Sequence, residues 1–547
     1  MNSPFKARSA GASAMFERSF RRRAVKHSEL AGALGSTLQK LREEGYVAAS
    51  VERVRQHAGA GSADAASELW STESIVDTGL VSLTSSANRP LVLDEGLLYF
   101  AADWRLEVDL ATNIAALANA PPMKRKHTSG VHEGLGENQR DALRHALCHQ
   151  LTVVSGGPGT GKTTLVGHLI RSWLADGGDP SRLLIAAPTG RAAARLSAAV
   201  ASSVEHSLPP ATTLHRALRW SPSQVRFQFD KNRPLDAQLV IVDEVSMADL
   251  GLMQALFSAL ASDAQVVLLG DKDQLVSVQP GSVMADLCMG LATSGASHCV
   301  QTLAENFRYS AQSGIARAAS AIRRGESAEL FDVLAQGDDV EQRALLTGLD
   351  TICADWLDFD HAVETIAIWG QLLSKRVLCA HRSGPAGVNR LNAMIFRWLR
   401  RNGHLDGRYV DHQQPFPGRL FSLQGNHYEA GFFNGDQGFI SQQGGQLMAW
   451  VESSDRTLKS LSPARLPPVE SAFAMTVHRA QGSEFGEVHC VLPDRSSPLL
   501  TRELLYTAIT RARQRVVIYA DQSALEKAVA TPASRGSGLA TRLRKMC

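Results

Sequence analysis

The feature that most constrains this 547-residue chain is a glycine-rich loop placed between an apolar run and an apolar helical stretch. The loop is GGPGTGKT (156–163), which follows LTVVSG (151–156) and precedes the helical stretch from Leu165 to Trp173. Glycines let successive backbone N–H groups turn toward one centre, and the start of the following helix adds the positive end of its dipole. The spacing G-x-x-x-x-G-K-[ST] therefore predicts a phosphate-binding loop in a parallel α/β sheet.

Each residue type in this loop suits one part of a nucleoside triphosphate. Lys162 can reach the β- and γ-phosphates, and the hydroxyl of Thr163 can ligate Mg²⁺. A glycine turn with a chance lysine is the alternative, and it is disfavoured because further motifs follow. We therefore expect ATP and Mg²⁺ as cofactors, with the nucleotide held by Gly156, Gly157, Pro158, Gly159, Thr160, Gly161, Lys162, Thr163 and Thr164.

Two later strand ends supply what phosphoryl transfer needs beside such a loop. LVIVDE (239–244) would deliver Asp243 to a magnesium ion and Glu244 to the attacking water as a base. QVVLLGD (265–271) ends shortly before Gln274, whose amide can sense the γ-phosphate. Taken alone, the acidic pair could equally cap the next helix, and the glutamine could belong to a polar turn. After a full phosphate loop the catalytic interpretation is favoured.

Short apolar runs alternate with helical stretches from Gly136 onward, a pattern typical of parallel sheets covered by helices on both faces. Between Arg400 and Pro468, short alternating strands rich in Gly, Gln and Phe instead predict a small inserted β-barrel. The apolar runs fall into two sets, which predict two α/β domains: 151–156, 182–188, 239–244 and 265–271, then 376–381, 487–493 and 515–521.

The region before the loop has a different pattern. Apolar residues at helical spacing from Ser28 to about Ala60 predict a small helical bundle. A hairpin around Asp94-Glu95-Gly96 is expected next, followed by a helix through Ala118 and a linker at 121–130. Residues 1–28, rich in Arg, Ser and Ala, are interpreted as a flexible basic tail or as an over-long start with initiation at Met15, in preference to a transit peptide.

Composition excludes little by itself. A net charge of +3, from 57 basic and 54 acidic residues, neither demands nor rules out a nucleic-acid partner. The seven cysteines form no C-x-x-C pair, which argues against a zinc site, an iron–sulfur cluster or a disulfide framework and favours the cytoplasm. No apolar run approaches the ~18 residues that a membrane span requires, so no membrane partner is expected.

Several ordered motifs resemble those of superfamily 1 helicases of the 5′→3′ branch, and specifically the RecD family. A glutamine, Gln139, stands in GENQRDAL ahead of the phosphate loop. The other motifs are APTGRAAARL (187–196), TTLHRAL (212–218), ENFRYS (305–310), CAHRSGPAGVNRLN (379–392), FNGDQG (433–438), AMTVHRAQGSEF (474–485) and LLYTAITRAR (504–513).

The resemblance implies an ATP-driven DNA helicase and assigns roles to residues in these motifs. Gln139 would read the adenine, and Arg308 and Arg511 would approach the γ-phosphate from the far wall of the cleft. Gly482 and Glu484 would lie near the ribose and the γ-phosphate. The residues implied to grip single-stranded DNA are Thr189, Arg191, Thr213, His215, Thr476 and His478.

The resemblance also implies a layout and partners. We expect an α/β chain with a small, mainly helical N-terminal domain that docks partners (1–115), RecA-like domain 1A (116–325), the first part of RecA-like domain 2A (326–399), an SH3-like β insertion, 2B (400–470), and the rest of 2A (471–547). The substrates would be single-stranded DNA and duplex DNA ends, and RecB-like and RecC-like subunits would complete a heterotrimer, with nuclease activity coming from a partner.

Two other functions stay open. A freestanding RecD-like helicase usually carries a longer N-terminal extension with helix–hairpin–helix repeats, whereas 155 residues without such repeats precede this loop. A P-loop switch that binds nucleotide without moving on DNA would not need the arginines and DNA motifs of the second domain.

Overall fold

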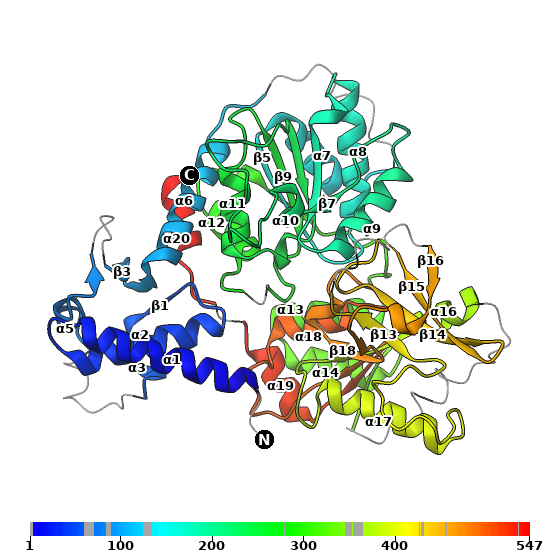
Figure 1. The fold of residues 1–547 in the computed structure, drawn as a ribbon. Helices are drawn as coiled ribbons and strands as arrows, with labels where there is room; N and C mark the ends of the chain where they lie inside the picture. The colour runs from blue at the N-terminus through cyan, green and yellow to red at the C-terminus, as the bar shows by residue number, and fades with distance from the viewer. Residues whose placement is uncertain are drawn as a thin grey trace.

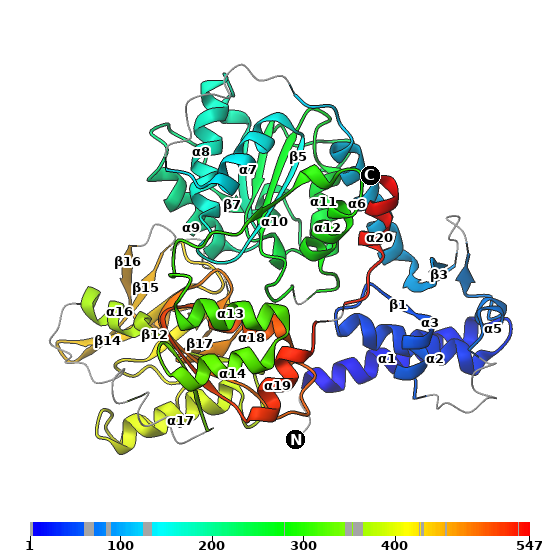
Figure 2. The same cartoon turned by 180° about the vertical axis from the view of Figure 1, so that it is seen from behind.

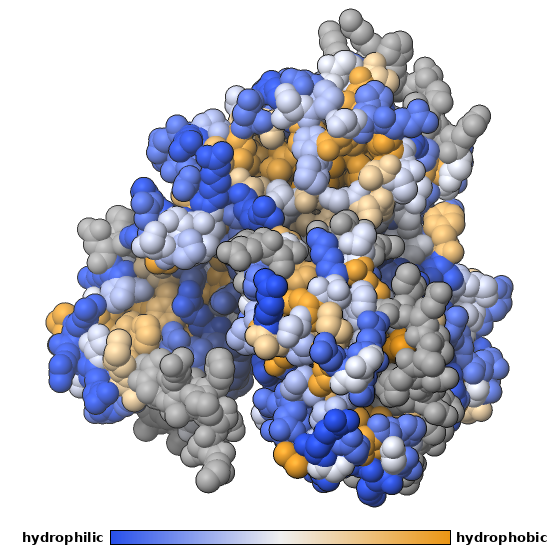
Figure 3. Space-filling view, turned by 45° about the vertical axis from the view of Figure 1, so that its right-hand side comes forward, coloured by the Kyte–Doolittle hydropathy of each residue, from blue (hydrophilic) through white to orange (hydrophobic). Residues whose placement is uncertain are grey.

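Two parallel sheets covered by helices form the body of the chain, and a smaller N-terminal unit lies beside them (Figure 1, Figure 2). In the space-filling view these bodies are lobes with a largely hydrophilic surface and scattered apolar patches (Figure 3). None of the helices in the described part of the chain combines the length and apolar character of a membrane crossing. The computed structural model describes residues 4–59, 70–83, 89–123, 134–277, 279–344, 353, 365–425, 427, 431–453, 457–533 and 535–547.

The first sheet is six-stranded and parallel, with the order β10-β5-β9-β8-β6-β7. Its central strands are apolar and buried on both faces, which is why their sequences read as continuous hydrophobic runs. The strands are β5 (Leu151–Gly156), β6 (Leu183–Ala187), β7 (Thr212–Thr213), β8 (Leu239–Val242), β9 (Gln265–Gly270) and β10 (Val300–Leu303). The helices around it are α7 (Glu137–Cys148), α8 (Lys162–Ala175), α9 (Gly190–Ala201), α10 (Leu214–Ala217), α11 (Leu250–Ser258) and α12 (Val283–Ala292).

The second sheet is five-stranded and parallel, with the order β11-β20-β19-β12-β18. Separate hydrophobic cores lie on its two faces. The predicted α/β fold with two parallel sheets is therefore confirmed. The strands are β11 (Val340–Arg343), β12 (Lys375–Cys379), β18 (Ala474–Thr476), β19 (Phe485–Val491) and β20 (Ala512–Tyr519), and the helices are α13 (Gly314–Arg324), α14 (Ser327–Gln336), α16 (Thr365–Ser374), α17 (Val388–Arg401), α18 (Arg502–Ile509) and α19 (Gln522–Ala530).

The inserted β-module is an antiparallel sheet of five strands in the order β16-β15-β14-β13-β17. Among the described residues its edge strands β16 and β17 do not pair with each other, so the expected barrel is an open sheet here. Likeness to an SH3 module stays a prediction. The strands are β13 (Leu420–Leu423), β14 (Gln437–Gln443), β15 (Gln446–Glu452), β16 (Leu458–Leu461) and β17 (Val469–Ser471).

The N-terminal region contains more regular structure than the sequence suggested. Its elements are α1 (Pro4–Arg23), α2 (Ser28–Glu43), β1 (Ala48–Ser50), α3 (Val51–His57), α5 (Thr72–Asp77), β2 (Val81–Ser82), β3 (Leu91–Asp94), β4 (Leu97–Phe100) and α6 (Ala101–Ala118). The hairpin is confirmed, and Glu95 and Gly96 at its turn both have left-handed φ values, of 51° and 75°. The helix through Ala118 is confirmed as well. Most of the expected linker falls outside the described residues.

Two N-terminal predictions are wrong. The chain from residue 4 is not a flexible tail, because α1 packs on α2 through Phe20, which is 4% exposed and lies over Gly35. Phe16 and Phe20 give the helix an apolar face at i, i+4 spacing that the surrounding Arg and Ser residues obscured. The second error concerns 48–50, which form β1 instead of helix because they pair with β4, so this region combines helices with a four-stranded sheet.

The chain ends on the first α/β domain, although its last residues follow the second domain in sequence. Helix α20 (Leu539–Met546) packs against α6 and α12, as Figure 1 shows at the side of the upper domain. Helix α6 belongs to the same core and runs through the expected boundary at residue 115. The fully buried carboxylate of Glu107 on α6 accepts bonds from Ser537 Oγ (2.8 Å), the Gly538 N–H (3.1 Å) and Arg542 Nε (3.0 Å).

Candidate active site

A cavity of about 280 Å³ lies between the two α/β domains. Every residue of the predicted catalytic set lines it: Lys162, Glu244, Gln274, Arg308 and Arg511. Thr163 and Asp243, the expected magnesium ligands, line the same cavity. Further lining residues are Pro158, Gly159, Thr160, Gly161, Thr164, Ala192, Arg195, Phe307 and Glu484.

The phosphate loop connects the buried end of β5 to the first turn of α8. Gly159 and Gly161 have left-handed φ values of 84° and 74°, which only glycine adopts at low cost, and a side chain at Gly159 would meet Arg308 Cβ at 2.5 Å. The ammonium of Lys162 donates to the carbonyls of Gly156 (2.6 Å) and Gly157 (3.0 Å). The loop's own backbone thus fixes the lysine where it can bind phosphate oxygens.

The acidic pair follows β8. Asp243 accepts a bond from the Glu244 N–H at 2.8 Å, and Glu244 has a left-handed φ of 55°. A non-glycine residue in this conformation costs about 1–3 kcal/mol and is typical of functional sites. The next long helix, α11, is capped by Asp249, whose side chain accepts a bond from the Leu252 N–H. Asp243 and Glu244 therefore do not cap α11.

The residues around Asp243 fit a magnesium ion. Burial, and then the neighbouring carboxylate of Glu244, raise the pKa of Asp243 to about 6. A divalent cation would relieve this crowding of acidic groups. Thr163 and Asp243 offer the hydroxyl and carboxylate oxygens that Mg²⁺ prefers, with phosphates and waters left to complete its shell.

Gln274 follows β9 and is held by Asp271. Its amide nitrogen donates to Asp271 Oδ2 at 3.0 Å, while its Oε1 is buried without a hydrogen-bond partner among the described residues. Asp271 also accepts a bond from Tyr506, on α18 of the second domain. The amide of Gln274 is therefore oriented from both domains, a role for Asp271 and Tyr506 that sequence reasoning missed.

Glu484 is the centre of an arginine cluster that spans the cleft. Its carboxylate pairs with Arg195 (2.6 Å) from α9, with Arg308, and with Arg513 (3.0 Å) from β20. Burial acts to raise the pKa of Glu484, but these guanidinium groups outweigh it and lower the pKa to about 2. Glu484 lies in the expected cavity, yet its contacts are arginines. Arg195 and Arg513 stand in two of the helicase-like motifs, but the sequence alone predicts no role for either.

Arg511 forms part of the far wall of the cavity. It is 2% exposed, and its guanidinium donates to the carbonyls of Thr507 (3.2 Å) and Ser483 (3.4 Å) in its own domain. Arg308 lies where the chain crosses between the domains, and its Nη1 is buried without a partner in the described part of the chain. Arg511 is thus placed to approach a nucleotide from the second domain. Arg308 lies beside the loop, because a side chain at Gly159 would meet its Cβ and the Phe307 N–H donates to the Gly159 carbonyl, so the expected far-wall position is wrong for Arg308.

Gln139 touches the loop from behind. Its Oε1 accepts from the Gly136 N–H at 3.0 Å, and its Nε2 donates to the Thr160 carbonyl at 3.1 Å. In this arrangement the amide fixes α7 to the loop, and Gln139 does not line the cavity. Gly482 has a φ of 73° and lies opposite Ala192, and it is also outside the lining set.

Three of the predicted DNA-binding residues are threonines at or just after strand ends. Thr189, Thr213 and Thr476 accept bonds from the N–H groups of Ala192 (3.3 Å), Arg216 (3.3 Å) and Arg479 (3.4 Å). Thr213 and Thr476 end β7 and β18, an edge strand of each sheet. Helix and turn starts with inward N–H groups are suited to phosphate oxygens.

The other predicted DNA residues have different surroundings. His215 is exposed and lies beside Trp220 and Phe227. His478 is half-buried, and burial followed by the nearby Arg535 lowers its pKa to about 4. Arg191 belongs to the first turn of α9. The inserted module reaches this region, because the Arg216 guanidinium lies 5.8 Å from the centre of the Phe433 ring.

Fold and cleft together define the class: a P-loop motor ATPase with two parallel α/β domains. Residues 139–280 match the family described as AAA domain, and residues 471–519 match the UvrD-like helicase C-terminal domain. The chain is 36% identical over 471 residues to the RecBCD enzyme subunit RecD of Mycolicibacterium smegmatis, with 82% of each chain covered. It is 29% identical to RecD of Haemophilus influenzae, covering 82% of this chain and 80% of that one.

A further relative is the ATP-dependent RecD2 DNA helicase of Deinococcus radiodurans, at 31% identity over 86% of this chain and 62% of that protein. The chain belongs to the RecD family of ATP-dependent DNA helicases.

Proposed function

We propose that this chain couples ATP hydrolysis to 5′→3′ movement on single-stranded DNA, as the RecD-like motor of a complex with RecB-like and RecC-like subunits. Such a complex would open duplex DNA ends in the cytoplasm during repair and recombination. The observation that carries the motor assignment is the shared cavity, lined by Lys162 and Glu244 from the first domain and by Glu484 and Arg511 from the second.

The cavity residues divide the chemistry of phosphoryl transfer among themselves. Lys162 neutralises the β- and γ-phosphates, and Glu244 accepts a proton from the attacking water. Gln274 orients that water through its unpartnered Oε1. Arg308 and Arg511 stabilise the charge that develops on the γ-phosphate. Mg²⁺, held by Thr163 and Asp243, would supply further charge neutralisation.

Nucleotide binding would redistribute the arginine cluster. Arg195 and Arg308 pair with the Glu484 carboxylate, and a γ-phosphate entering the cavity carries more negative charge than that carboxylate. The two arginines would turn toward the phosphate and change the contacts that join the domains. Hydrolysis of ATP and release of the products would restore the ion pairs with Glu484. Each ATP would thus drive one closing and one opening of the cleft between the domains.

Single-stranded DNA would lie across the strand ends that carry Thr189, Thr213 and Thr476. Gripping phosphates through hydroxyls and backbone N–H groups allows stepping without reading the sequence. Arg191, His215 and His478 would complete this track. Because phosphate contacts dominate, binding should weaken steeply as salt is raised.

Assembly with partners is supported by the length and identity of the match to chains named as RecBCD subunits. The freestanding alternative is the RecD2 relative, of which this chain covers 62%. Helices α1, α2 and α3 share a core with α5 and with strands β2, β3 and β4, and these three helices are our candidate docking surface. The N-terminal residues as a whole are not free for docking, because α6 is part of the first domain's core.

The test is unwinding of partial duplexes with either a 5′ or a 3′ single-stranded tail. We expect ATP-dependent unwinding of the 5′-tailed substrate, no DNA degradation by the isolated chain, and co-purification with RecB-like and RecC-like chains. Unwinding confined to 3′-tailed DNA would contradict the polarity. A processive monomer that ignores those chains would instead favour the freestanding helicase.

A further inference from the structure

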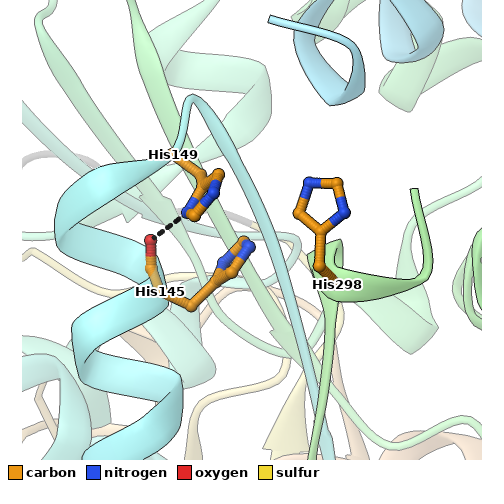
Figure 4. A group of neighbouring side chains, drawn as sticks. All are labelled: His145, His149 and His298. Atoms are coloured by element: carbon orange, nitrogen blue, oxygen red, sulfur yellow. Dashed lines mark hydrogen bonds between the residues drawn. The ribbon is translucent and has the colours of Figure 1, made fainter. Parts of the chain in front are cut away.

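Three histidines lie together on the first α/β domain (Figure 4). They are at the end of its sheet away from the nucleotide cavity, because they precede β5 and β10 whereas the phosphate loop follows β5. His145 is near the end of α7 and His149 directly follows that helix, just before β5, whereas His298 lies in the short helix η3 (Ser297–Cys299), just before β10. The candidate ligand nitrogens of the three side chains all lie within 4.8 Å of one another. The phosphate loop follows the other end of β5, so the histidines are outside the proposed catalytic machinery.

The fold brings the three rings together for local reasons. His145 lies in the last turn of α7 and His149, four residues on, is the C-cap whose N–H bonds to the His145 carbonyl, so their rings stack at 3.9 Å. Strands β5 and β10 are neighbours in the sheet, so the residues just before them are neighbours too. The ring of His298 lies 5.5 Å from that of His145 and 5.2 Å from that of His149.

Hydrogen bonds leave one ring nitrogen of two of these histidines available to a metal ion. His149 Nδ1 lies 3.1 Å from the carbonyl oxygen of His145, which can only accept, so Nδ1 carries the proton and Nε2 keeps its lone pair. His145 Nδ1 pairs with Thr152 Oγ1 at 2.9 Å, and its Nε2 is buried with no partner among the described residues. Metal-binding histidines characteristically use one ring nitrogen for such a bond and the other for the ion.

We propose that His145, His149 and His298 bind one divalent transition-metal ion, Zn²⁺ being the representative, through three imidazole nitrogens with a further position open to solvent. Tetrahedral coordination at Zn–N distances of about 2.0–2.1 Å requires ligand nitrogens roughly 3.3 Å apart. Closing the present spacing requires movement of the exposed His298 side chain and a turn of the partly exposed His149 ring away from its parallel stacking on His145. Mg²⁺ prefers oxygen ligands and should not compete. Cysteine spacing argues against a zinc site made of cysteines, and it does not bear on a site made of three histidines.

Such an ion would link the end of α7 to the start of β10. The other end of each of these elements leads to contacts with the phosphate loop. Helix α7 begins beside Gln139, which donates to the Thr160 carbonyl. The chain after β10 reaches the loop through Asn306 Nδ2, which donates to the Pro158 carbonyl at 2.8 Å, and through the Phe307 N–H, which donates to the Gly159 carbonyl at 2.8 Å. The ion would therefore stabilise the frame around the loop from a distance, without touching nucleotide.

The experiment uses the untagged full chain, stripped of metal and held in excess Mg²⁺, titrated with Zn²⁺ by calorimetry and with Co²⁺ by visible absorption. We expect saturable binding of one ion per chain and a Co²⁺ spectrum of tetrahedral type. His298→Ala and His149→Ala should each abolish the spectrum. His206→Ala, which removes an exposed histidine elsewhere on the same domain, should leave it unchanged.

A second variant tests the orientation of the site apart from its ligands. Thr152→Val keeps the buried volume but removes the hydroxyl beside His145 Nδ1, and it should weaken Zn²⁺ binding roughly 10–100-fold. Melting curves without metal check that every variant is folded. The proposal is overturned if the folded wild-type chain shows no saturable binding, or if His298→Ala and His149→Ala bind as tightly as the wild type.

Discussion

The hydroxyl of Tyr506 donates a hydrogen bond of 3.0 Å to Asp271 Oδ2, across the cleft between the two α/β domains. The same oxygen accepts from the amide of Gln274 at 3.0 Å. Burial, and then the charge of Asp271, raise the pKa of the Tyr506 hydroxyl, which therefore stays protonated as a donor. A helix of the second domain thus helps to fix the residue that we expect to orient the attacking water.

Tyr506→Phe should retain ATP binding and lower DNA-stimulated kcat. One hydrogen bond of this kind contributes about 0.5–1.5 kcal/mol, which corresponds to a roughly 2- to 13-fold loss of rate. Steady-state ATPase assays with single-stranded DNA measure it. Tyr409→Phe, in the second domain away from the cavity, is the matched control. If Tyr506→Phe and Tyr409→Phe have equal kcat, the hydrogen bond of Tyr506 does not couple the second domain to catalysis.

Lys162→Ala and Glu244→Gln should each abolish ATP hydrolysis and unwinding and leave the melting temperature close to that of the wild type. Both side chains line the cavity and neither is part of a hydrophobic core. Glu244→Gln should still bind nucleotide, because it removes the proton acceptor alone. Near-normal turnover in either variant would disprove the assignment of the site.

Arg511→Ala should bind ATP with nearly unchanged affinity and lose most of kcat. Arginines that act on the transition state typically contribute ~10³–10⁵ in rate. Because Arg511 is buried, Arg511→Lys serves as the second variant, which keeps a positive charge but changes the geometry. If nucleotide affinity falls while kcat is preserved in the folded variants, Arg511 is a binding residue only.

Glu484→Gln should destabilise the chain at neutral pH, with an effect that disappears in acid. The folded pKa of about 2 lies below the ordinary value near 4.5, so the carboxylate stabilises the folded state above pH ~4.5 and loses this contribution as pH falls toward 2. The full shift corresponds to about 3 kcal/mol. Urea midpoints of wild type and variant between pH 7 and pH 3 should converge as pH falls. A constant difference would show that the arginine pairs are not responsible.

Arg542→Ala should destabilise the first domain by about 3 kcal/mol, because it removes the cation paired with fully buried Glu107. Lys545→Ala is the control on the same helix, since Lys545 pairs with Glu95 at an exposed site, where pairs contribute about 0–1 kcal/mol. Urea unfolding measures both. Equal effects of the two changes would mean that α20 is held by its apolar residues alone.

The sequence predicted what depends on local spacing. The phosphate loop, the acidic pair after β8 and the buried strands follow from short patterns, and the structure confirms the two parallel sheets that they imply. No local pattern in the sequence predicts contacts between segments that are far apart along the chain. Arg195 and Glu484 meet across the cleft although 289 positions separate them, and no periodicity marks either one. The apolar face of α1 was obscured for another reason, since Phe16 and Phe20 stand in a strongly basic stretch.

The attachment of the last helix to the first domain has a mechanical consequence. The chain enters the second domain after β10 and returns from it between α19 and α20, so two covalent crossings join the domains. A body held at two points pivots about the line through them and resists twisting in other directions. A nucleotide-driven movement of the second domain would therefore follow one arc. Cutting the chain between α19 and α20 would leave the catalytic groups in place, but the second domain could then rotate in directions that do not open or close the cleft.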